Sequence, residues 1–284
     1  MTFAEFFAGI GGFRLGLERA GMGCVWANEL DDYACRVYRA RERGDNGVGF
    51  PSAPGASVLV QADINGIDPA TIPPADVWCG GFPCQDISQA GKRKGIHGER
   101  SGLWWAWLKL VCVVRPRILF LENVSGLLAA GRGMDAVLGS LAESGYDAEW
   151  DCIPASAVGA SQPRRRVFIL AYDAGERLPT DLLASCSHDQ SGREAEPERW
   201  KRQSQRLCGR LGNTPFPPGF VDEGWTRAVQ EGWETPVVER GLCGTDVRFS
   251  TWLDRLRCLG NAVVPQVVEW IGRRMVAAFR RQEG

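Results

Sequence analysis

The hexapeptide Phe7-Ala8-Gly9-Ile10-Gly11-Gly12 lies between a predicted strand and a predicted helix at the start of the chain. Thr2–Phe7 has the pattern of a strand, and Gly12–Ala20 has that of a helix. Glycines let the backbone come close to a ligand at the carboxyl end of a first strand, although such turns also serve tight helix packing. The spacing is not the dinucleotide-binding fingerprint, because Arg14 occupies the position of its third glycine. The stretch predicts an α/β fold with a ligand site at this turn.

Strand and helix patterns alternate along the first 172 residues, which predicts a mostly parallel sheet in a βαβ arrangement. Ile118–Glu122 begins with an unbroken apolar run, typical of a strand buried on both faces. Gly44–Ser57 is rich in glycine and proline and predicts a surface loop. Further strands are expected at Cys24–Glu29, Val58–Gln61, Asp76–Cys79, Ala148–Ile153 and Val167–Tyr172, and further helices at Asp31–Arg43, Ser101–Val114, Met134–Ser144 and Pro265–Arg280.

Two acidic residues follow the second and third predicted strands. Glu29 ends the second strand and is well placed to accept hydrogen bonds from ribose hydroxyl groups. Asp63 follows the third strand, where its carboxylate is able to accept a hydrogen bond from an adenine amino group. A glycine turn with two such acceptors, and without a basic residue dedicated to a phosphate, indicates an adenosine-containing ligand.

A cysteine lies at the end of another predicted strand. The sequence Gly80-Gly81-Phe82-Pro83-Cys84-Gln85 follows the apolar run Ala75–Cys79 and opens a polar loop, Asp86–Gly98. A strand end is where an α/β enzyme places a nucleophile, so Cys84 is a candidate. The alternative is a small buried hydrophobic residue, as most of the 10 cysteines are expected to be.

The composition is that of a soluble globular protein, with 284 residues, 44% hydrophobic residues, 24% charged residues and a net charge of −1. No apolar run reaches membrane-spanning length and no signal peptide is recognisable, so a cytoplasmic location is expected. The cysteines contain no Cys-x-x-Cys pair and only two histidines are present, so no metal site is expected. Basic clusters occur at 92–94 and 164–166 and, more loosely, at Arg199, Lys201, Arg202, Arg206 and Arg210.

Seven segments together resemble the motifs of the DNA cytosine-5 methyltransferases, bacterial or phage type, and they occur in the order of that family. They are Phe7–Gly12, Asn28-Glu29, Asp63-Ile64, Gly80–Gln85, Glu122-Asn123-Val124, Gln162-Pro163-Arg164-Arg165-Arg166 and Leu259–Pro265. The resemblance implies a Rossmann-like domain that binds S-adenosyl-L-methionine. The residues implied to bind this cofactor are Phe7, Gly9, Ile10, Gly11, Gly12, Glu29, Asp63, Ile64, Pro83, Leu103, Asn261 and Ala262.

The resemblance also implies a mechanism. The Cys84 thiolate would add to carbon 6 of a cytosine, and Glu122, with a pKa raised by burial, would protonate N3. Arg164 and Arg166 would assist catalysis and hold the nucleotide. The base must leave the duplex, so base flipping is expected, with the loop Ser88–Arg100 closing over it. The residues implied to contact DNA are Gln85, Ser88, Lys92, Arg93 and Gln162.

The expected domains are a catalytic domain, 1–172 with 252–284, and a small irregular target-recognition domain, 173–251. Resemblance is weakest in 173–251, where base-edge contacts are expected from the five loosely clustered basic residues. Double-stranded DNA is the expected partner of a monomer, and a cognate restriction endonuclease is a further partner that the family allows. Three other interpretations of the function remain open. They are the same chemistry on RNA, a catalytically silent DNA-binding protein, and a Rossmann oxidoreductase, which the missing third glycine of the dinucleotide-binding fingerprint disfavours.

Overall fold

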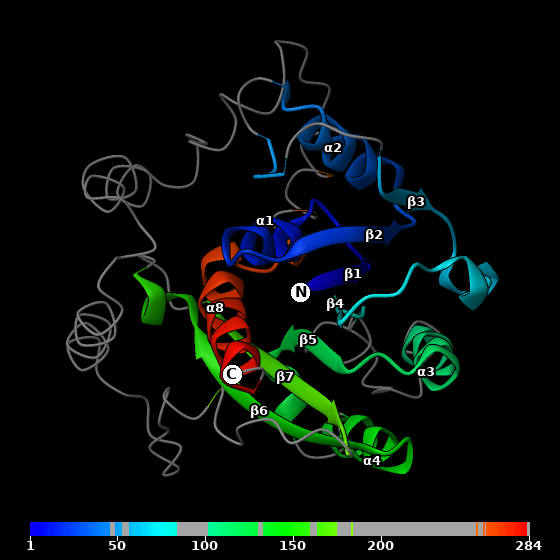
Figure 1. The fold of residues 1–284 in the computed structure, drawn as a ribbon, viewed down its shortest axis with the longest axis vertical. Coiled ribbons are helices and arrows are strands. Elements are labelled where there is room, and N and C mark those ends of the chain that lie inside the picture. Colours follow the sequence, from blue (N-terminus) through cyan, green and yellow to red (C-terminus); the bar gives the residue numbers. More distant parts are fainter. Residues whose placement is uncertain are drawn as a thin grey trace.

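The computed structural model of the chain describes residues 1–45, 49–52, 57–83, 102–129, 133–159, 164–174, 183, 254, 258 and 260–282. Within these residues, strands and helices alternate as expected (Figure 1). The strands are β1 (Thr2–Phe6), β2 (Gly23–Glu29), β3 (Leu59–Gln61), β4 (Val77–Gly80), β5 (Ile118–Val124), β6 (Tyr146–Pro154) and β7 (Arg165–Asp173). The α-helices are α1 (Gly12–Arg19), α2 (Asp32–Glu42), α3 (Gly102–Val114), α4 (Met134–Glu143) and α8 (Pro265–Gln282).

The strands form one seven-stranded sheet in the order β3-β2-β1-β4-β5-β7-β6. The neighbours from β3 to β5 are parallel, whereas β7 is antiparallel to both β5 and β6. The prediction of an α/β fold with a mostly parallel sheet is confirmed. The strand order reverses between β1 and β4, and in open α/β sheets ligands bind at the carboxyl ends of strands at such a point.

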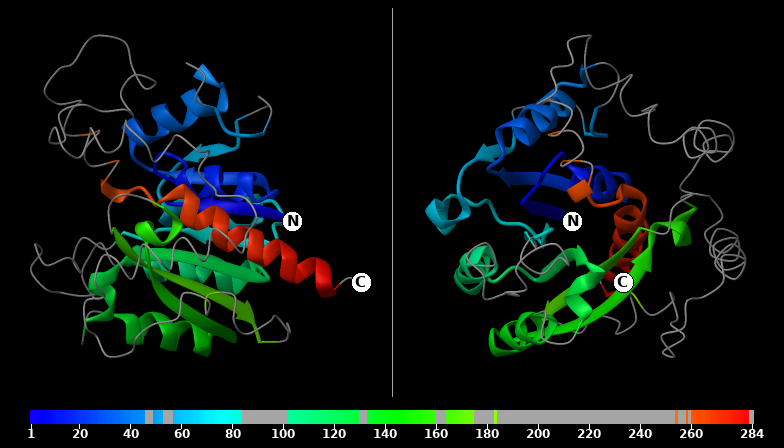
Figure 2. Two further views of the ribbon diagram at one scale, coloured as in Figure 1. Left: turned by 90° about the vertical axis from the view of Figure 1, so that its left-hand side faces the viewer. Right: turned by 180° about the vertical axis from the view of Figure 1, so that it is seen from behind.

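Helices cover both faces of the sheet (Figure 2). Phe3 of β1 and Val77 of β4 pack with side chains of α1 and α8, whereas Ala4 and Trp78 point to the opposite face and pack with α3 and α4. This alternation follows from the two-residue repeat of a strand. Both faces are buried, which explains why the central strands read as continuous apolar runs.

The C-terminal helix α8 returns to lie beside α1, as the resemblance implied. The contact is close because it contains glycine. A Cβ atom on Gly16 of α1 would lie 2.5 Å from the carbonyl oxygen of Pro265 and 2.7 Å from Val268. On the other side, a Cβ atom on Gly272 would lie 2.9 Å from Ala20. The two ends of the chain are therefore joined at the face that carries the glycine turn.

The bounds of every predicted element agree with the structure to within two residues. Differences of two residues occur at the end of β5, at the starts of β6 and β7, and at the end of α8. β6, for example, begins at Tyr146 rather than Ala148, because it pairs residue by residue with β7 from Tyr146 opposite Asp173. The prediction of a surface loop at 44–57 is wrong in one respect: Phe50 is buried, with 7% of its surface exposed.

Residues 173–251, which the sequence predicts to form a target-recognition domain, lie almost entirely outside the described residues. None of the helices in the described ranges has the length and apolar character that a membrane span requires.

Candidate active site

The turn after β1 has an unusual backbone. Phe7, Gly9 and Gly11 all have positive φ angles, of 51°, 53° and 81°. The Ala8 amide donates to the carbonyl oxygen of Asn28 at 2.9 Å, and the Gly9 amide donates to Glu29 Oε2 at 2.7 Å. The turn is thus fixed to the end of β2, and its glycines provide the conformations that other residues adopt with difficulty.

Glu29 is itself held by the backbone. Its Oε1 accepts hydrogen bonds from the amides of Leu30 and Asp31, each at 2.8 Å. Glu29 Oε2 accepts only the Gly9 amide among the described residues, so its second lone pair is still able to accept a hydrogen bond from a ribose hydroxyl group. The neighbouring Asn28 side chain donates to the carbonyl oxygens of Val60 and Ala62, which ties the end of β2 to β3.

Asp63 lies just beyond this junction, on the same edge of the sheet as Glu29. Its Oδ1 accepts from the amide of Asn65 at 2.9 Å, and this hydrogen bond lowers the pKa of the Asp63 carboxyl. The carboxylate is exposed, whereas the adjacent Ile64 is buried. The structure therefore brings the three sequence-predicted cofactor segments together at the carboxyl edge of β1, β2 and β3.

The segment that leads to Cys84 lies against Glu122. Gly80 pairs with Leu121 across β4 and β5, and a Cβ atom on Gly80 would lie 2.3 Å from the carbonyl oxygen of Phe6. A Cβ atom on Gly81 would lie 3.0 Å from Glu122 Oε2. Glycine at position 81 thus leaves room for the Glu122 carboxyl group, which a Cβ atom would displace slightly.

Phe82 and Asn123 extend this contact. The Asn123 side chain donates to the Phe82 carbonyl oxygen at 3.3 Å. The buried Phe82 ring packs on Trp104 of α3, with ring centroids 4.8 Å apart. Pro83 is the last described residue before Cys84, which lies outside the described residues together with Gln85, Ser88, Lys92, Arg93 and Gln162.

Glu122 is buried, with 6% of its surface exposed. Arg166 Nε lies 3.0 Å from Glu122 Oε1, but the N–H is not aligned with the oxygen, and Oε1 has no hydrogen-bond donor among the described residues. Burial raises the pKa of the Glu122 carboxyl to about 7, and the guanidinium groups of Arg166 and Arg164 lower it by less. The raised pKa expected from the sequence is confirmed, and a carboxyl with this pKa is able to donate a proton near neutral pH.

Arg164 and Arg166 link β7 to the segment before α8. Arg164 Nη2 donates to the carbonyl oxygens of Gly260 and Ala262 at 2.8 Å and 2.6 Å, and Arg166 Nη2 donates to Gly260 at 3.4 Å. The next residue, Val263, lies on the glycine turn, because a Cβ atom on Gly12 would be 2.8 Å from its Cγ1. Asn261 and Ala262 therefore lie between the turn and the arginines.

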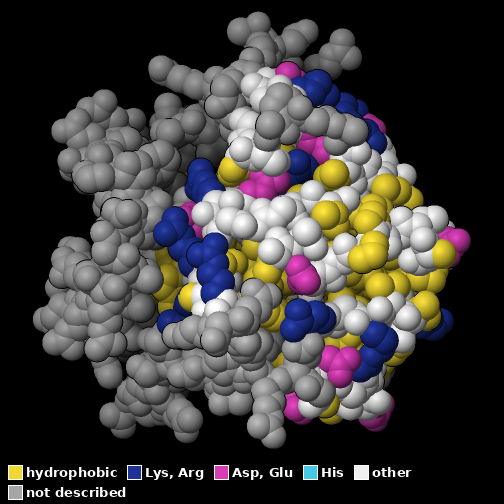
Figure 3. Space-filling view, viewed as in Figure 1, with side chains coloured by type: hydrophobic (Ala, Val, Ile, Leu, Met, Phe, Trp, Pro, Cys, Tyr) yellow, Lys and Arg dark blue, Asp and Glu magenta, His cyan; other side chains and the backbone are white. Residues whose placement is uncertain are grey.

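The described surface is unevenly charged. In the space-filling view, Lys and Arg side chains gather next to α8, and apolar side chains are more frequent on the opposite side of the same face (Figure 3). Arg273 and Arg280 of α8 are exposed. The five basic residues expected to read base edges, from Arg199 to Arg210, lie outside the described residues.

These sites correspond to a known family. The family model of the C-5 cytosine-specific DNA methylases matches residues 1–212. The chain belongs to this family. S-adenosylmethionine is the methyl donor of C-5 cytosine methylases.

Relatives within the C-5 cytosine-specific methylases include M.HhaI of Haemophilus parahaemolyticus, a Type II methyltransferase that is 33% identical over 61% of this chain and 49% of its own length. The Type II methyltransferase M.NgoFVII of Neisseria gonorrhoeae is 35% identical over 61% of this chain and 43% of its own length. The chain thus matches about half the length of these curated relatives.

Solved structures share the fold. A putative DNA modification methyltransferase encoded within an Escherichia coli prophage has a TM-score of 0.59 at 18% identity, with 99% of both chains covered. The Dnmt2 methyltransferase of S. pombe has a TM-score of 0.57 at 16% identity, with 100% of both chains covered. These likenesses support the α/β architecture of the methylase domain.

Two residues near the methylase site were not recognised from the sequence. Arg14 was noted only as a departure from a glycine pattern, yet it is buried and forms ion pairs with Glu18 and Glu42, each at 2.8 Å. Phe50 was assigned to a surface loop, yet it packs over Gly11. The available signal was that Phe50 is the only aromatic residue within the glycine- and proline-rich stretch 44–57.

Proposed function

We propose that this protein transfers a methyl group from S-adenosyl-L-methionine to carbon 5 of a cytosine in duplex DNA, through a covalent adduct with Cys84. The observation that carries the proposal is the contact between Gly81 and the Glu122 carboxyl group, three residues before Cys84. It joins the candidate nucleophile segment to a buried acid whose pKa is raised to about 7. A nucleophile beside a proton donor is what addition to a cytosine ring requires.

Carbon 5 of cytosine is a poor nucleophile until the ring is activated. Addition of the Cys84 thiolate to carbon 6 activates it, and the Glu122 carboxyl protonates N3, so that negative charge does not accumulate on the ring. The activated carbon 5 then takes the methyl group from the sulfonium of the cofactor. A base removes the proton from carbon 5, and β-elimination breaks the bond to Cys84. Glu122 must therefore be protonated when addition begins, and the raised pKa favours this state at neutral pH.

Arg166 has a role in the position of the acid. Its Nε lies 3.0 Å from Glu122 Oε1, which limits where the carboxyl group points while burial keeps its pKa raised. Arg164 is instead bonded to the carbonyl oxygens of Gly260 and Ala262, and we assign it to holding the cofactor side of the site together. The initial expectation that both arginines also contact the nucleotide stays a prediction.

The cytosine has to leave the duplex to reach Glu122, at a cost of a few kcal/mol for unstacking and unpairing. We assign the closure over the flipped base to residues 88–100, with Lys92 and Arg93 on DNA phosphates. We assign target recognition to residues 173–251 as a domain separate from 1–172 and 252–284. We further propose that a cytoplasmic monomer performs the reaction, alone or beside a cognate restriction endonuclease.

DNA is the proposed substrate rather than RNA. The matching family model describes DNA methylases, and the relatives at 33–35% identity are named Type II methyltransferases. The motif after the nucleophile, residues 85–95, also follows the DNA pattern.

The test uses S-adenosylmethionine with an isotope-labelled methyl group and duplex DNA of mixed sequence, followed by digestion to nucleosides and mass spectrometry. The expected result is label in 5-methyldeoxycytidine only, and none with the Cys84→Ala variant. Label in another base, or none with cofactor bound, would contradict the proposal. Mixed-sequence RNA is treated in parallel, and label there but not in DNA would favour the RNA reading.

A further inference from the structure

The glycine turn needs support from its surroundings. Phe7 is not a glycine, yet its φ of 51° lies in the left-handed region, next to Gly9 and Gly11 at 53° and 81°. Backbones in this region persist only when neighbouring groups fix them. One set of supports comes from β2, where Glu29 and Asn28 bind the amides of Gly9 and Ala8. These supports act on the first half of the turn.

The second half of the turn is supported from another segment. A Cβ atom on Gly11 would lie 2.4 Å from Phe50 Cζ and 3.1 Å from Tyr38 Cε2, so the Phe50 ring lies directly on the backbone of the turn. Arg41 Nη1 donates to the carbonyl oxygen of Ile10 at 3.0 Å, and the Arg41 carbonyl oxygen accepts from the Phe50 amide at 3.2 Å. Arg41 therefore fixes Ile10 and the Phe50 ring fixes Gly11, and the two supports are bonded to each other.

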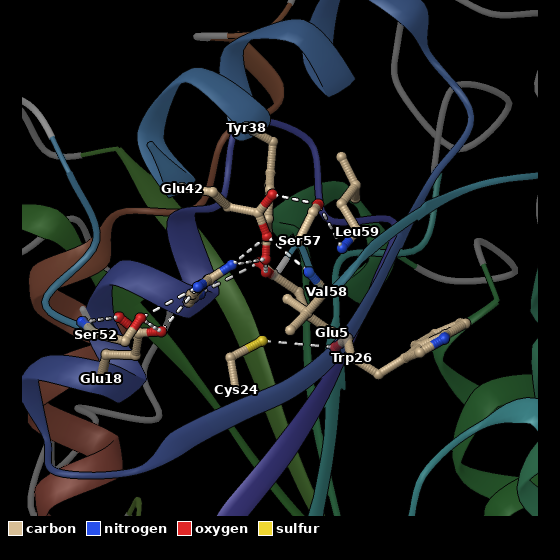
Figure 4. A network of polar contacts seen from close by, with 11 residues as sticks. Glu5, Glu18, Cys24, Trp26, Tyr38, Glu42, Ser52, Ser57, Val58 and Leu59 are labelled. Atoms are coloured by element: carbon tan, nitrogen blue, oxygen red, sulfur yellow. Dashed lines mark hydrogen bonds and ion pairs between the residues drawn. The ribbon is translucent and has the colours of Figure 1, made fainter. Parts of the chain in front are cut away.

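Phe50 is held in turn by a buried group of charges. Figure 4 shows two carboxylates of this group, Glu18 and Glu42, with Ser52 and Ser57 beside them. The Arg14 guanidinium lies 4.1 Å from the centroid of the Phe50 ring, within the range of a cation–π contact. Arg14 also bridges Glu18 and Glu42 at 2.8 Å each. Glu18 accepts from the amide and hydroxyl of Ser52, at 3.0 Å and 2.8 Å, two residues beyond Phe50.

Glu42 fixes the other end of the segment that connects α2 to β3. Its Oε1 accepts from the Val58 amide at 3.0 Å, and its Oε2 accepts from the Ser57 hydroxyl. Both described ends of the connection between α2 and β3 are therefore bonded to carboxylates that Arg14 bridges. A loop with no role in the site does not require this arrangement, since loops usually lie on the surface with few buried contacts.

We propose that Phe50 is a positioning residue for the cofactor: its ring, supported by Arg14, holds Ile10 and Gly11 in the conformation that S-adenosylmethionine binds. This inference rests on the proposed cofactor role of the turn. When the ring is absent, the turn populates other conformations. The apparent dissociation constant then equals the intrinsic one divided by the fraction of molecules whose turn is still able to bind the cofactor. If that fraction is one tenth, the dissociation constant rises about tenfold. In this scheme Phe50 takes no part in the chemical step, so turnover at saturating cofactor is unchanged.

The experiment is calorimetric titration of the full chain with S-adenosylmethionine, at a temperature well below every melting point. The variants are Phe50→Ala, the conservative Phe50→Leu, and the matched control Phe279→Ala. Phe279 is as buried as Phe50, at 6% exposed, but lies on α8 in a different hydrophobic cluster. The steady-state KM for S-adenosylmethionine and kcat on DNA are measured for the same proteins.

The expected result is a dissociation constant and KM raised about tenfold in Phe50→Ala, partly restored in Phe50→Leu, with kcat and the KM for DNA unchanged. Phe279→Ala is expected to lower the melting temperature without a change in affinity. Wild-type affinity in Phe50→Ala, or equal weakening in Phe279→Ala, would overturn the inference and leave the proposed function intact. If the wild-type chain itself does not bind the cofactor, both the inference and the proposed function are wrong.

Discussion

Glu5 in β1 and Glu122 in β5 are both buried glutamates, and burial raises the pKa of both, to about 8 for Glu5 and about 7 for Glu122. Their surroundings differ. Both oxygens of Glu5 accept hydrogen bonds, one from the Tyr38 hydroxyl at 2.9 Å and one from the Arg14 amide at 3.3 Å. Among the described residues, Glu122 Oε1 has only the unaligned ion pair with Arg166. A raised pKa thus identifies a buried acid, and the unsatisfied oxygen distinguishes the acid that is available for chemistry.

The largest expected difference between the two glutamates is in catalysis. Glu122→Gln removes the proton proposed for N3, so the rate of methyl transfer is expected to fall about 10²- to 10⁴-fold. Glu5→Gln replaces a mostly neutral acid with an amide of the same shape, so the rate should stay within about threefold. Single-turnover transfer of labelled methyl groups to DNA measures both. Equal losses in the two variants would show that Glu122 has no role beyond that of a buried side chain.

The next effect is on stability and concerns the group of charges around Arg14. Arg14→Met leaves Glu18 and Glu42 buried without their partner, which is expected to cost about 3–5 kcal/mol and to lower the melting temperature by about 10 °C. The control is Arg36→Met. Arg36 also pairs with an acid one helical turn away, Asp32, but its side chain is 62% exposed. Exposed pairs contribute about 0–1 kcal/mol.

Thermal denaturation of both arginine variants at neutral pH provides the measurement. A melting temperature of Arg14→Met close to that of Arg36→Met would contradict the structural role given to the buried pair.

A smaller effect is the pH dependence of stability. The folded pKa of Glu5 lies above its ordinary value of 4.5, so folding favours the protonated form. Its contribution to stability is therefore complete below pH 4.5 and is lost as the pH rises towards 8. Tyr38, Arg14 and Glu18 surround Glu5, but burial has a larger effect on its pKa than any of these groups. Between pH 5 and pH 8, the wild-type chain should lose a few kcal/mol relative to Glu5→Gln, since one pKa unit corresponds to about 1.4 kcal/mol.

Urea denaturation of wild type and Glu5→Gln across this pH range tests whether the wild-type chain loses stability relative to the variant as the pH rises. In the same comparison with Glu122→Gln, the loss of wild-type stability should end near pH 7, because the folded pKa of Glu122 is lower than that of Glu5. Parallel stability curves for wild type and Glu5→Gln would rule out the buried neutral acid.

Much of the fold could be predicted from the sequence, because each strand and helix has its own local pattern of apolar residues and glycine. The turn at Phe7–Gly12, the strand before Gly80 and the helix that starts at Pro265 are each determined by neighbours in the chain. The juxtaposition of Gly81 with Glu122 was implied only by the order of motifs, since two parallel strands must first pair to bring them together.

The burial of Phe50 and Arg14 could not be predicted in the same way. The two residues are 36 positions apart, and Phe50 lies in a stretch with the composition of a loop. An arginine is expected at the surface unless buried acids accompany it, and Glu42 joins it only when the end of α2 comes within reach of Arg14. The direction of β7 likewise depends on its antiparallel pairing with β5 and β6 rather than on its own sequence.

If Cys84 attacks the cytosine ring as proposed, a covalent trap captures the adduct between the two. Duplex DNA that contains 5-fluorocytosine is incubated with the protein and S-adenosylmethionine and then analysed on a denaturing gel, because fluorine cannot leave as the proton does. The control is Cys79→Ala. Cys79 is five residues before Cys84 but fully buried, and burial raises the pKa of its thiol well above the ordinary value. We expect a stable protein–DNA band for wild type and Cys79→Ala and none for Cys84→Ala. A band that survives in Cys84→Ala, or no band with wild type despite cofactor binding, would contradict the proposed attack by Cys84.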